Sequence, residues 1–267
     1  ISRQMAAPFA VSISRAIKKV TGFTGQRLYR DWVAELKLQY AGDLATVHGR
    51  EVKGEVLLPE GTANLHPVWH PTDRKFALLS NRDADYFGQT DLYIYDFAGK
   101  KKLKKVAAAV NSAPLWSPDG NQLYYAKRST MDQTGARWLD LFVYDLSTRK
   151  EDRLTHGERA TSPIWIDGET IAYLTVYDGV SNIKTLQLPT GELSALTSFE
   201  DGGYIHSLAY IPADSTLIFD ATINHGRDLH RLNLATGASS LFVPGRLPPN
   251  SDLREPGTHS DGVVLST

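Results

Sequence analysis

The chain contains no cysteine among its 267 residues, and that absence excludes several kinds of chemistry. Without cysteine there are no disulfide bonds, no cysteine-ligated zinc and no thiol nucleophile. The absence also agrees with a bacterial protein that works outside the cytoplasm. We therefore expect a location in the bacterial periplasm or at the cell surface.

The chain also lacks an excess of charge of either sign and any long apolar run. Its formal net charge is -1 at pH 7, whereas nucleic-acid-binding proteins usually carry a basic face. A membrane-spanning helix needs roughly 18 consecutive apolar residues, and no run in the sequence approaches that length. We expect neither a nucleic-acid partner nor a membrane span.

Recognisable catalytic motifs are missing as well. The sequence has no Gly-x-Ser-x-Gly elbow, no phosphate-binding glycine loop, no dinucleotide fingerprint and no His-Glu-x-x-His. We therefore predict no catalytic residue and no cofactor. His66 and His70 are spaced like metal ligands on a helix, but Pro67 between them prevents a helix, so structural roles are expected.

A second metal-like pattern consists of Asp83, Asp85 and Gly88, which resembles the start of a calcium-binding loop. Phe87 occupies the next ligand position, and Ile94 stands where the closing glutamate is required. We therefore favour a polar loop in which aspartate and glycine serve the turn geometry, and we predict no metal.

What the sequence does contain is a repeat. One short phrase recurs at intervals of about 45 to 49 residues, with a fifth start at Glu255-Pro256: Pro67-Val68-Trp69, Pro114-Leu115-Trp116, Pro163-Ile164-Trp165 and the altered Leu208-Ala209-Tyr210. Self-similarity at this period indicates one supersecondary unit stacked on copies of itself.

Each repeat holds two strand-like apolar runs separated by a polar loop. These pairs cover residues 76–79 and 92–95, 122–125 and 141–144, 170–174 and 183–186, and 216–219 and 229–232. With the proline phrase and a short closing strand, each unit has four antiparallel strands. The sequence therefore predicts an all-β fold, a β-propeller with four complete blades and partial ones. We expect the proline phrase to open the innermost strand and its aromatic residue to pack between blades, as part of the core.

A short helical segment is predicted before the propeller. Apolar residues recur there at spacings of three and four: Phe9, Ile13, Ile17 and Val20, then Leu28, Trp32 and Leu36. Thr24 is the expected N-cap of the second helix. The period changes to two from Ala45, and residues 45–58 are expected to be rich in strand. We place the boundary between a helical part, residues 1–42, and a propeller, residues 43–267.

The second repeat resembles a known family. Ser117-Pro118-Asp119-Gly120 follows the proline phrase, and Leu123-Tyr124-Tyr125 and then residues 140–145 complete the pattern. This pattern resembles the WD40-like (PD40) propeller repeat of the TolB family, which has relatives in tricorn protease and in prolyl oligopeptidase-type enzymes. The resemblance covers roughly residues 64–267. His70-Pro71-Thr72-Asp73 departs from it, and the third and fourth repeats are less complete.

A weaker resemblance concerns the helical segment. Residues 16–22, followed by Leu28-Tyr29-Arg30-Asp31-Trp32, are similar to the end of gluzincin-type metallopeptidase domains, which precede TolB-like propellers in some bacterial proteins. The resemblance implies that the catalytic helix of such a domain would lie before this chain. The chain starts at Ile1 and stops within a repeat at Thr267, so we expect it to be part of a longer precursor.

Two interpretations of the blade number stay open. The stretch 45–58 and the half-repeat 255–267 could combine into one blade and close a ring of five. Alternatively, the chain is cut from a ring of six or more blades, which we slightly prefer because relatives have six.

Two long loops, residues 82–90 and 127–138, are expected to emerge on one face of the propeller. Long loops on a rigid scaffold commonly carry binding residues, although solvated connections are an equal alternative. With a turn in the fourth repeat, they supply the predicted partner-binding residues Arg82, Asp83, Asp85, Tyr86, Arg128, Asp132, Arg137, Trp138, Asn224, His225 and Arg227. The lysine run at residues 100–105 is expected at the rim of its blade, where lysines deter edge-to-edge pairing.

The sequence therefore predicts a non-catalytic propeller that binds a protein or peptide partner through its loop face. The alternative is an accessory or substrate-gating propeller region of a larger bacterial peptidase whose catalytic domain lies outside this chain.

Overall fold

The computed structural model describes residues 2, 12–86, 88–99, 102–200, 202–223 and 226–243, together with the backbone of 254–259 and 262–266. The chain divides into two compact units, Ile1–Leu57 and Leu58–Thr267. This division lies later than position 42, where the sequence pattern placed it. The first unit is helical and the second consists of β-sheets, and we describe each by itself.

The helical unit contains three helices of more than one turn among its described residues: α2 (Ile13–Thr21), α3 (Gly25–Gln39) and α4 (Ala41–His48). The Ser12 hydroxyl caps α2, and Gly22 ends it in the left-handed conformation that glycine adopts readily. The Thr24 hydroxyl accepts the backbone N–H of Arg27 at 3.2 Å, so the predicted N-cap of α3 is confirmed. No helix in the described part of the chain is both long and apolar enough to cross a membrane.

The expectation of strand over residues 45–58 is wrong. Residues 41–48 form α4, and the described chain from 49 to 63 contains no strand. The physical reason is that the helical hydrogen-bond ladder continues past the end of α3, where the backbone N–H of Leu44 donates to the carbonyl of Tyr40 at 2.9 Å. Val52 and Val56 are exposed, with no neighbouring strand to pair with.

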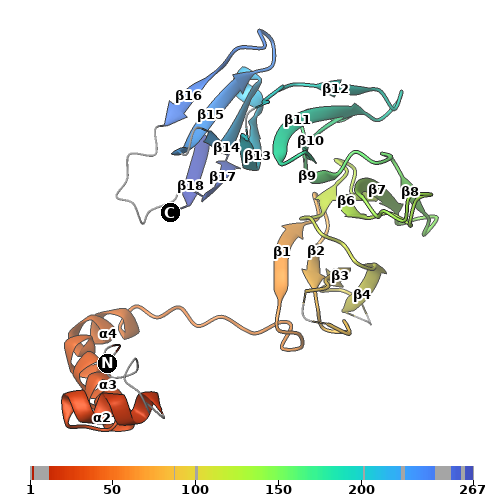
Figure 1. Cartoon of the computed structure of the whole chain (residues 1–267). Helices are drawn as coiled ribbons and strands as arrows, with labels where there is room; N and C mark the ends of the chain where they lie inside the picture. The colour runs from red at the N-terminus through yellow and green to blue at the C-terminus, as the bar shows by residue number, and fades with distance from the viewer. Residues whose placement is uncertain are drawn as a thin grey trace. The chain divides into compact units, whose positions relative to one another are not determined.

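The β unit consists of four antiparallel four-stranded sheets and one two-stranded sheet, which follow one another along an arc in Figure 1. Blade 1 comprises β1 (Asn64–Trp69), β2 (Lys75–Ser80), β3 (Asp91–Asp96) and β4 (Leu103–Ala107). Blade 2 comprises β5 (Leu115–Trp116), β6 (Gln122–Arg128), β7 (Leu139–Asp145) and β8 (Glu151–Arg153). Blade 3 comprises β9 (Ala160–Trp165), β10 (Thr170–Tyr177), β11 (Val180–Gln187) and β12 (Leu193–Ala195). Blade 4 comprises β13 (Tyr204–Ile211), β14 (Thr216–Ile223), β15 (Gly226–Asn233) and β16 (Ser239–Val243), with the short 3-10 helix η1 (Pro212–Asp214) between its first two strands. The hairpin β17 (Arg254–His259) and β18 (Gly262–Ser266) follows.

This arrangement confirms the predicted propeller blades and their number of complete repeats. In each blade, the strands are hydrogen-bonded in chain order. The half-repeat at the C-terminal end pairs only within itself, as β17 with β18, so the described strands form no composite blade from the two ends of the chain.

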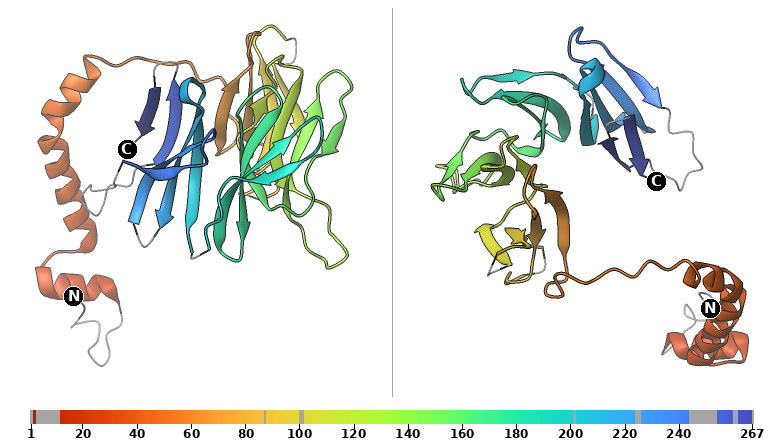
Figure 2. Two further views of the ribbon diagram at one scale, coloured as in Figure 1. Left: turned by 90° about the horizontal axis from the view of Figure 1, so that it is seen from above. Right: turned by 180° about the vertical axis from the view of Figure 1, so that it is seen from behind.

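The hydrophobic core lies between blades, because the second strand of each blade is apolar on both faces. In β6, Leu123 and Tyr125 belong to the cluster shared with blade 1, whereas Tyr124 and Ala126 belong to the cluster shared with blade 3. β10 repeats this alternation between blades 2 and 4. Figure 2 shows the sheets standing side by side, as these shared clusters require. The continuous apolar runs of the sequence are therefore strands buried on two sides.

A tryptophan from the first strand of a blade links that blade to its predecessor. The indole Nε1–H of Trp116 donates to the carbonyl of Val68 in blade 1 at 3.0 Å. The indole Nε1–H of Trp165 donates to the carbonyl of Trp116 at 2.6 Å. The prediction that these aromatic residues pack between blades is confirmed at both positions. The expectation that the phrase opens the innermost strand is wrong, because β1, β5 and β9 end at Trp69, Trp116 and Trp165, where the chain turns toward the second strand.

The same prediction is wrong for Trp69. Its side chain is 63% exposed, whereas Trp116 is only 4% exposed. Trp69 stacks on Phe97 and meets the edge of Phe76, both from its own blade, with ring centroids 5.9 and 5.5 Å away. The reason is positional, since in the described chain no strand comes before β1 to supply a preceding blade.

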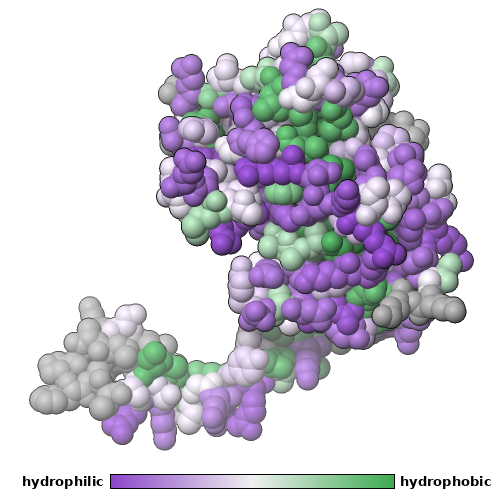
Figure 3. Space-filling model, turned by 90° about the vertical axis from the view of Figure 1, so that its right-hand side faces the viewer, coloured by the Kyte–Doolittle hydropathy of each residue, from purple (hydrophilic) through white to green (hydrophobic). Residues whose placement is uncertain are grey.

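The outer strands β4 and β8 are polar on their exposed side, whereas β12 exposes Leu193 and β16 exposes Leu241 and Phe242. Figure 3, which views the β unit from the side of β4, β8 and β12, shows a largely hydrophilic surface with apolar strips. Lys104 is exposed on β4, and Lys105 on the same strand pairs with Asp91. The lysine run therefore reaches the outer strand as predicted, except that Lys100 and Lys101 lie outside the described residues.

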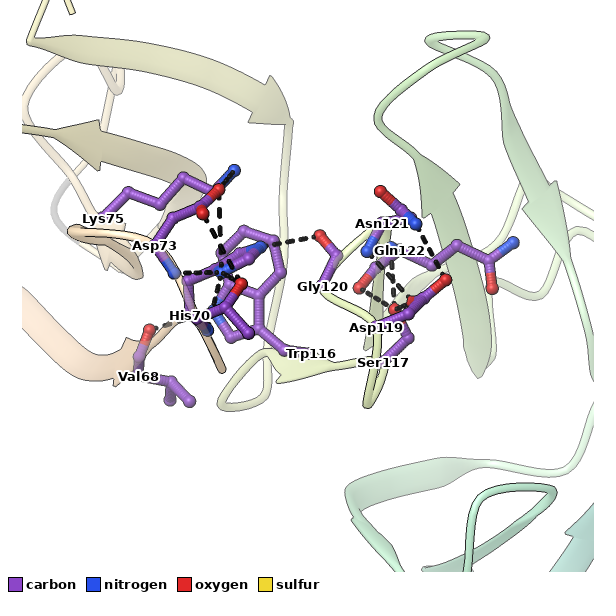
Figure 4. Close-up of polar contacts among 11 residues, drawn as sticks. Val68, His70, Asp73, Lys75, Trp116, Ser117, Asp119, Gly120, Asn121 and Gln122 are labelled. Carbon is purple, nitrogen blue, oxygen red and sulfur yellow. Dashed lines mark hydrogen bonds and ion pairs between the residues drawn. The ribbon is translucent and has the colours of Figure 1, made fainter. Parts of the chain in front are cut away.

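Blades 1 and 2 are further joined by His70, at the turn after β1 (Figure 4). Its Nδ1 accepts the backbone N–H of Asp73 at 2.9 Å, so the proton is on Nε2, which donates to the carbonyl of Gly120 at 3.0 Å. The ring also meets the edge of Trp116 at 4.7 Å. Both ring nitrogens are thus used in the structure, which agrees with the predicted structural role.

We predict that Gly120→Ala is much more damaging than Gly191→Ala. Both glycines have left-handed backbones, with φ of 73° and 71°. A Cβ at Gly120 would lie 2.0 Å from Nε2 of His70, whereas one at Gly191 would meet nothing within 4 Å. Gly191→Ala should cost about 1–2 kcal/mol from the backbone alone, and Gly120→Ala about 2–5 kcal/mol with the added overpacking. Urea unfolding followed by circular dichroism measures the difference, and equal losses would contradict the contact.

We also predict that Trp116→Ala and Trp69→Ala differ sharply in their cost to stability, although both residues end the first strand of their blade. Removing the buried Trp116 deletes its packing and its link to Val68, for about 3–5 kcal/mol. Removing the exposed Trp69 should cost only about 1 kcal/mol, since it loses aromatic contacts within one blade. Urea midpoints from circular dichroism provide the test, and a loss at Trp69 as large as at Trp116 would show that its face is covered in solution.

Candidate functional site

The loops expected to carry function converge where blade 1 crosses into blade 2. The hydroxyl of Thr90, at the end of the first long loop, donates to the carbonyl of Val110 at 2.7 Å. Val110 in turn forms an isolated antiparallel bridge with Lys127, at the end of β6. These contacts place the loop 81–90, the crossing 108–113 and the loop 129–138 on one face, as predicted for the two long loops.

A cavity of about 380 Å³ lies at this junction. This volume falls in the range of small-ligand pockets, roughly 300–1,000 Å³. The lining residues come from the crossing, from β6 and β7, from the second long loop and from β8: Ala108, Ala109, Lys127, Arg128, Ser129, Thr130, Met131, Arg137, Phe142 and Glu151. Of the predicted partner-binding residues, Arg128 and Arg137 are brought together here.

The positive charge of the cavity is only partly neutralised. The Lys127 ammonium pairs with the Glu151 carboxylate and lies 4.8 Å from the centre of the Phe142 ring. The Tyr125 hydroxyl donates to the same carboxylate. Burial, followed by this hydrogen bond, raises the pKa of Tyr125 far above its ordinary value. Arg128 and Arg137 are exposed, and no carboxylate of the described chain lies within ion-pair distance of either.

Asp132 and Trp138, two further predicted residues, shape the loop instead of lining the cavity. The Asp132 carboxylate accepts hydrogen bonds from the backbone N–H groups of Thr134 and Ala136 and, at 3.1 Å, from the indole of Trp138. The guanidinium of Arg159, in the segment leading to blade 3, stacks 4.1 Å from the Trp138 ring. The base of the loop is therefore anchored, so that Arg137 is presented from a fixed position.

The predicted residues of the first long loop lie at a different hollow. Arg82, Asp85 and Tyr86 line a cavity of about 280 Å³, together with residues that precede β1. Asp83 does not line it, since its carboxylate accepts the Tyr93 hydroxyl at 2.9 Å and lies 3.6 Å from Arg82. Burial, followed by this hydrogen bond, raises the pKa of the Tyr93 phenol.

Of the predicted residues of blade 4, the described one, Arg227, joins neither cavity. Arg227 donates from Nε to the Asp220 carboxylate at 3.0 Å, and Asp220 is fully buried, so this pair holds blade 4 together. Asn224 and His225 lie outside the described residues. The predicted set is thus divided among two cavities, a loop scaffold and an internal ion pair.

One group of site-forming residues was missed from the sequence. At the start of the third strand of blades 1 to 3, a carboxylate or amide oxygen accepts backbone N–H groups of the segment that leaves that blade. Asp91 accepts from Ala109 at 2.9 Å, Asp140 from Glu158 at 3.1 Å, and Asn182 from Phe199 at 2.7 Å. The recurring Asp/Asn-Leu/Ile pair at this position was the available signal.

Asp91 has a direct effect on the cavity because it positions the backbone of Ala109, one of the lining residues. Burial, the largest influence, would raise the pKa of Asp91, but the hydrogen bonds from Lys105 and Ala109 and the charge of Lys105 outweigh it. The pKa therefore lies below the ordinary value of 3.8. The described residues contain no group of three or more potential metal ligands.

Comparison with known proteins supports the fold more than the activity. No protein-family model matches the chain. It is 33% identical over 93 residues to the Tol-Pal system protein TolB of Ruthia magnifica subsp. Calyptogena magnifica, covering 34% of the chain and 20% of that protein. It is 24% identical over 119 residues to the uncharacterized peptidase YuxL of Bacillus subtilis (strain 168), covering 43% of the chain and 18% of that protein.

A solved structure gives the same result for the fold. The TolB structure from Acinetobacter baumannii matches with a TM-score of 0.54 at 19% identity, covering 69% of this chain and 44% of that one. The chain carries a TolB-like β-propeller. The matched parts span no more than a fifth of either curated relative and less than half of the solved structure. The similarity of the helical unit to a gluzincin-type domain stays a prediction.

We predict that Asp91→Asn flattens the acid dependence of stability. Because the folded-state pKa is lowered, the ionised carboxylate stabilises the fold above pH 3.8, and this stability is lost as the pH falls through the folded value. The variant should lose urea stability at pH 7 and approach the wild type at low pH. Asp152→Asn, which changes an exposed carboxylate on β8, is the control and should leave the profile unchanged. If Asp91→Asn leaves the pH dependence of urea stability unchanged, the lowered pKa of Asp91 is contradicted.

Proposed function

We propose that this chain is a non-catalytic propeller region that binds a protein or peptide partner through the loop face at the junction of blades 1 and 2. The observation that carries the proposal is the cavity of about 380 Å³, where the crossing from blade 1 meets blade 2. Arg128, at the end of β6, and Arg137, in the loop before β7, both line it. Propeller blades supply a rigid scaffold for such loops, and their exposed ends are free to vary.

The contacts around the cavity support binding by a preformed surface. The crossing is fixed by the bonds of Thr90 and Asp91, and the second long loop is fixed by Asp132 and by the stacking of Trp138 on Arg159. A surface ordered in this way loses little conformational entropy when a partner binds.

A second candidate is a substrate-gating or accessory propeller region of a larger bacterial peptidase. The similarity to the peptidase YuxL favours it, and the resemblance of the helical unit to the end of a gluzincin-type domain agrees with it. In this case the loop face would contact many peptides through their backbone, with little dependence on sequence. We propose a periplasmic or cell-surface location for either role, on the absence of cysteine and the likeness to TolB of the Tol-Pal system.

The proposal is tested with a phage-displayed library of random peptides selected on the whole chain. We expect peptides with a shared sequence pattern, and we expect synthetic copies to lose binding when residues 131–136 are replaced by two glycines. That change removes Met131 from the cavity and shortens the loop between β6 and β7. Biolayer interferometry measures the binding.

The control inserts two glycines after Gly168, in the turn between β9 and β10. This turn lies at the opposite end of β10 from the turn that leads to β11. It is therefore on the face of the propeller opposite to the long loops. Binding should survive this change. If no peptide is selected, or if the selected peptides still bind after the loop between β6 and β7 is replaced, this face has no role in binding. If the selected peptides share no sequence pattern, the result favours the gating role.

A further inference from the structure

We infer that the cavity between blades 1 and 2 is a carboxylate-binding site, which recognises the acidic group of a peptide or protein. This inference rests on the proposed function and specifies the chemistry of its ligand. The geometry that points to it is a cavity lined by two arginines without an ion-pair partner in the described chain and by several apolar residues.

The charges of the cavity fall into two classes. Lys127 and Glu151 neutralise each other within the wall, and Tyr125 supplies a further donor to that carboxylate. Arg128 and Arg137 remain, and neither has a carboxylate of the described chain within ion-pair distance. The cavity therefore presents two positive charges that the described residues do not balance.

Arginine is suited to this role because its planar guanidinium donates two parallel hydrogen bonds to one carboxylate. The two arginines come from different places, one from the end of β6 and the other from the last part of the loop before β7. Arg137 precedes Trp138, whose stacking on Arg159 and hydrogen bond to Asp132 hold the loop base in place. The fold thus holds the backbone positions of the two arginines, while their guanidinium groups are exposed.

The apolar residues that line the cavity are our reason for expecting a peptide to fit better than a free small anion. Met131, Phe142 and Ala108 contribute apolar surface to the cavity, which would cover the aliphatic stem or a neighbouring side chain of an acidic residue.

A strained backbone lies at the same place. Ala109 lines the cavity and has a φ of 56°, in the left-handed region that costs a residue with a Cβ about 1–2 kcal/mol. Asp91 holds the Ala109 N–H in this conformation at 2.9 Å. Such conformations cluster at ligand-binding sites, where the surrounding structure maintains them.

The test measures binding of three dye-labelled hexapeptides to the whole chain by fluorescence anisotropy. The first alternates glutamate with valine and has an amidated C-terminus. The second replaces glutamate by glutamine and is also amidated. The third is the glutamine peptide with a free C-terminal carboxylate. These peptides separate side-chain carboxylates, a terminal carboxylate and the uncharged backbone as sources of binding.

We expect a carboxylate-bearing peptide to bind roughly tenfold or more tightly than the amidated glutamine peptide. Tight binding by the glutamate peptide alone identifies acidic side chains as the ligand, and tight binding by the free-terminus peptide identifies a chain end. Higher salt should weaken the binding, because exposed charges are screened. Equal binding of all three peptides overturns the inference.

The variant Arg128→Glu/Arg137→Glu should reduce binding of the acidic peptide to the level of the glutamine peptide. The control Lys104→Glu/Lys150→Glu makes the same change of charge at exposed residues of β4 and of the turn before β8, and should retain binding. If circular dichroism shows that Arg128→Glu/Arg137→Glu does not fold, Arg128→Gln/Arg137→Gln is used in its place. Full binding by either folded arginine variant, or equal loss in the control, overturns the site.

Failure of this inference is distinguishable from failure of the proposed function. Peptides selected on the loop face that contain no acidic group, but still need residues 131–136, would remove the carboxylate site and leave partner binding intact. Selection of no loop-dependent peptide would remove both.

Discussion

The β unit depends on one constraint, which is that the second strand of each blade is apolar on both faces. β6 shows it most clearly, because Leu123 and Tyr125 face the cluster shared with blade 1 while Tyr124 and Ala126 face the one shared with blade 3. A single blade cannot cover two such faces, so stability comes from stacking neighbours. The tryptophan links then fix how neighbours meet, since the indoles of Trp116 and Trp165 donate to backbone carbonyls one blade back.

The same stacking creates the candidate site. Where the chain leaves one blade and enters the next, its backbone must turn across the face of the propeller, and a polar side chain at the start of the third strand holds it there. Asp91 performs this role beside the cavity, and Asp140 performs it with four donors, among them the Arg153 guanidinium at 2.6 Å and the Thr155 hydroxyl at 2.9 Å. The cavity is therefore a consequence of how two blades are joined. Its unpaired positive charge comes from Arg128, at the end of β6, and from Arg137, in the loop before β7.

The sequence predicted the blades because their signal is local and repeated: a proline phrase, two apolar runs and a turn. It did not predict that Trp69 is exposed. The exposure of this side chain depends on whether a neighbouring blade covers it, and the residues of the phrase are similar in both cases. It also took residues 45–58 as strand, where the continuing hydrogen-bond ladder of the helix prevailed over the pattern. Among the predicted site residues, Arg128 and Arg137 line the same cavity, whereas Arg227 forms an ion pair with the buried Asp220. An unpaired and a paired arginine look alike in sequence.

The distinction between the two proposed roles rests on the loops and not on the blades. TolB of the Tol-Pal system and the peptidase YuxL both match parts of this chain, so the shared blade pattern cannot separate a partner-binding role from a peptidase-associated one. A surface that reads many peptides through their backbone has little use for two fixed, uncompensated guanidinium groups, because these favour ligands with a carboxylate at one position. Both side chains are exposed and hydrated, and a ligand carboxylate would form charge-assisted hydrogen bonds with them. The presence of Arg128 and Arg137 in one cavity is therefore our reason for proposing selective recognition of a partner ahead of general passage of substrates.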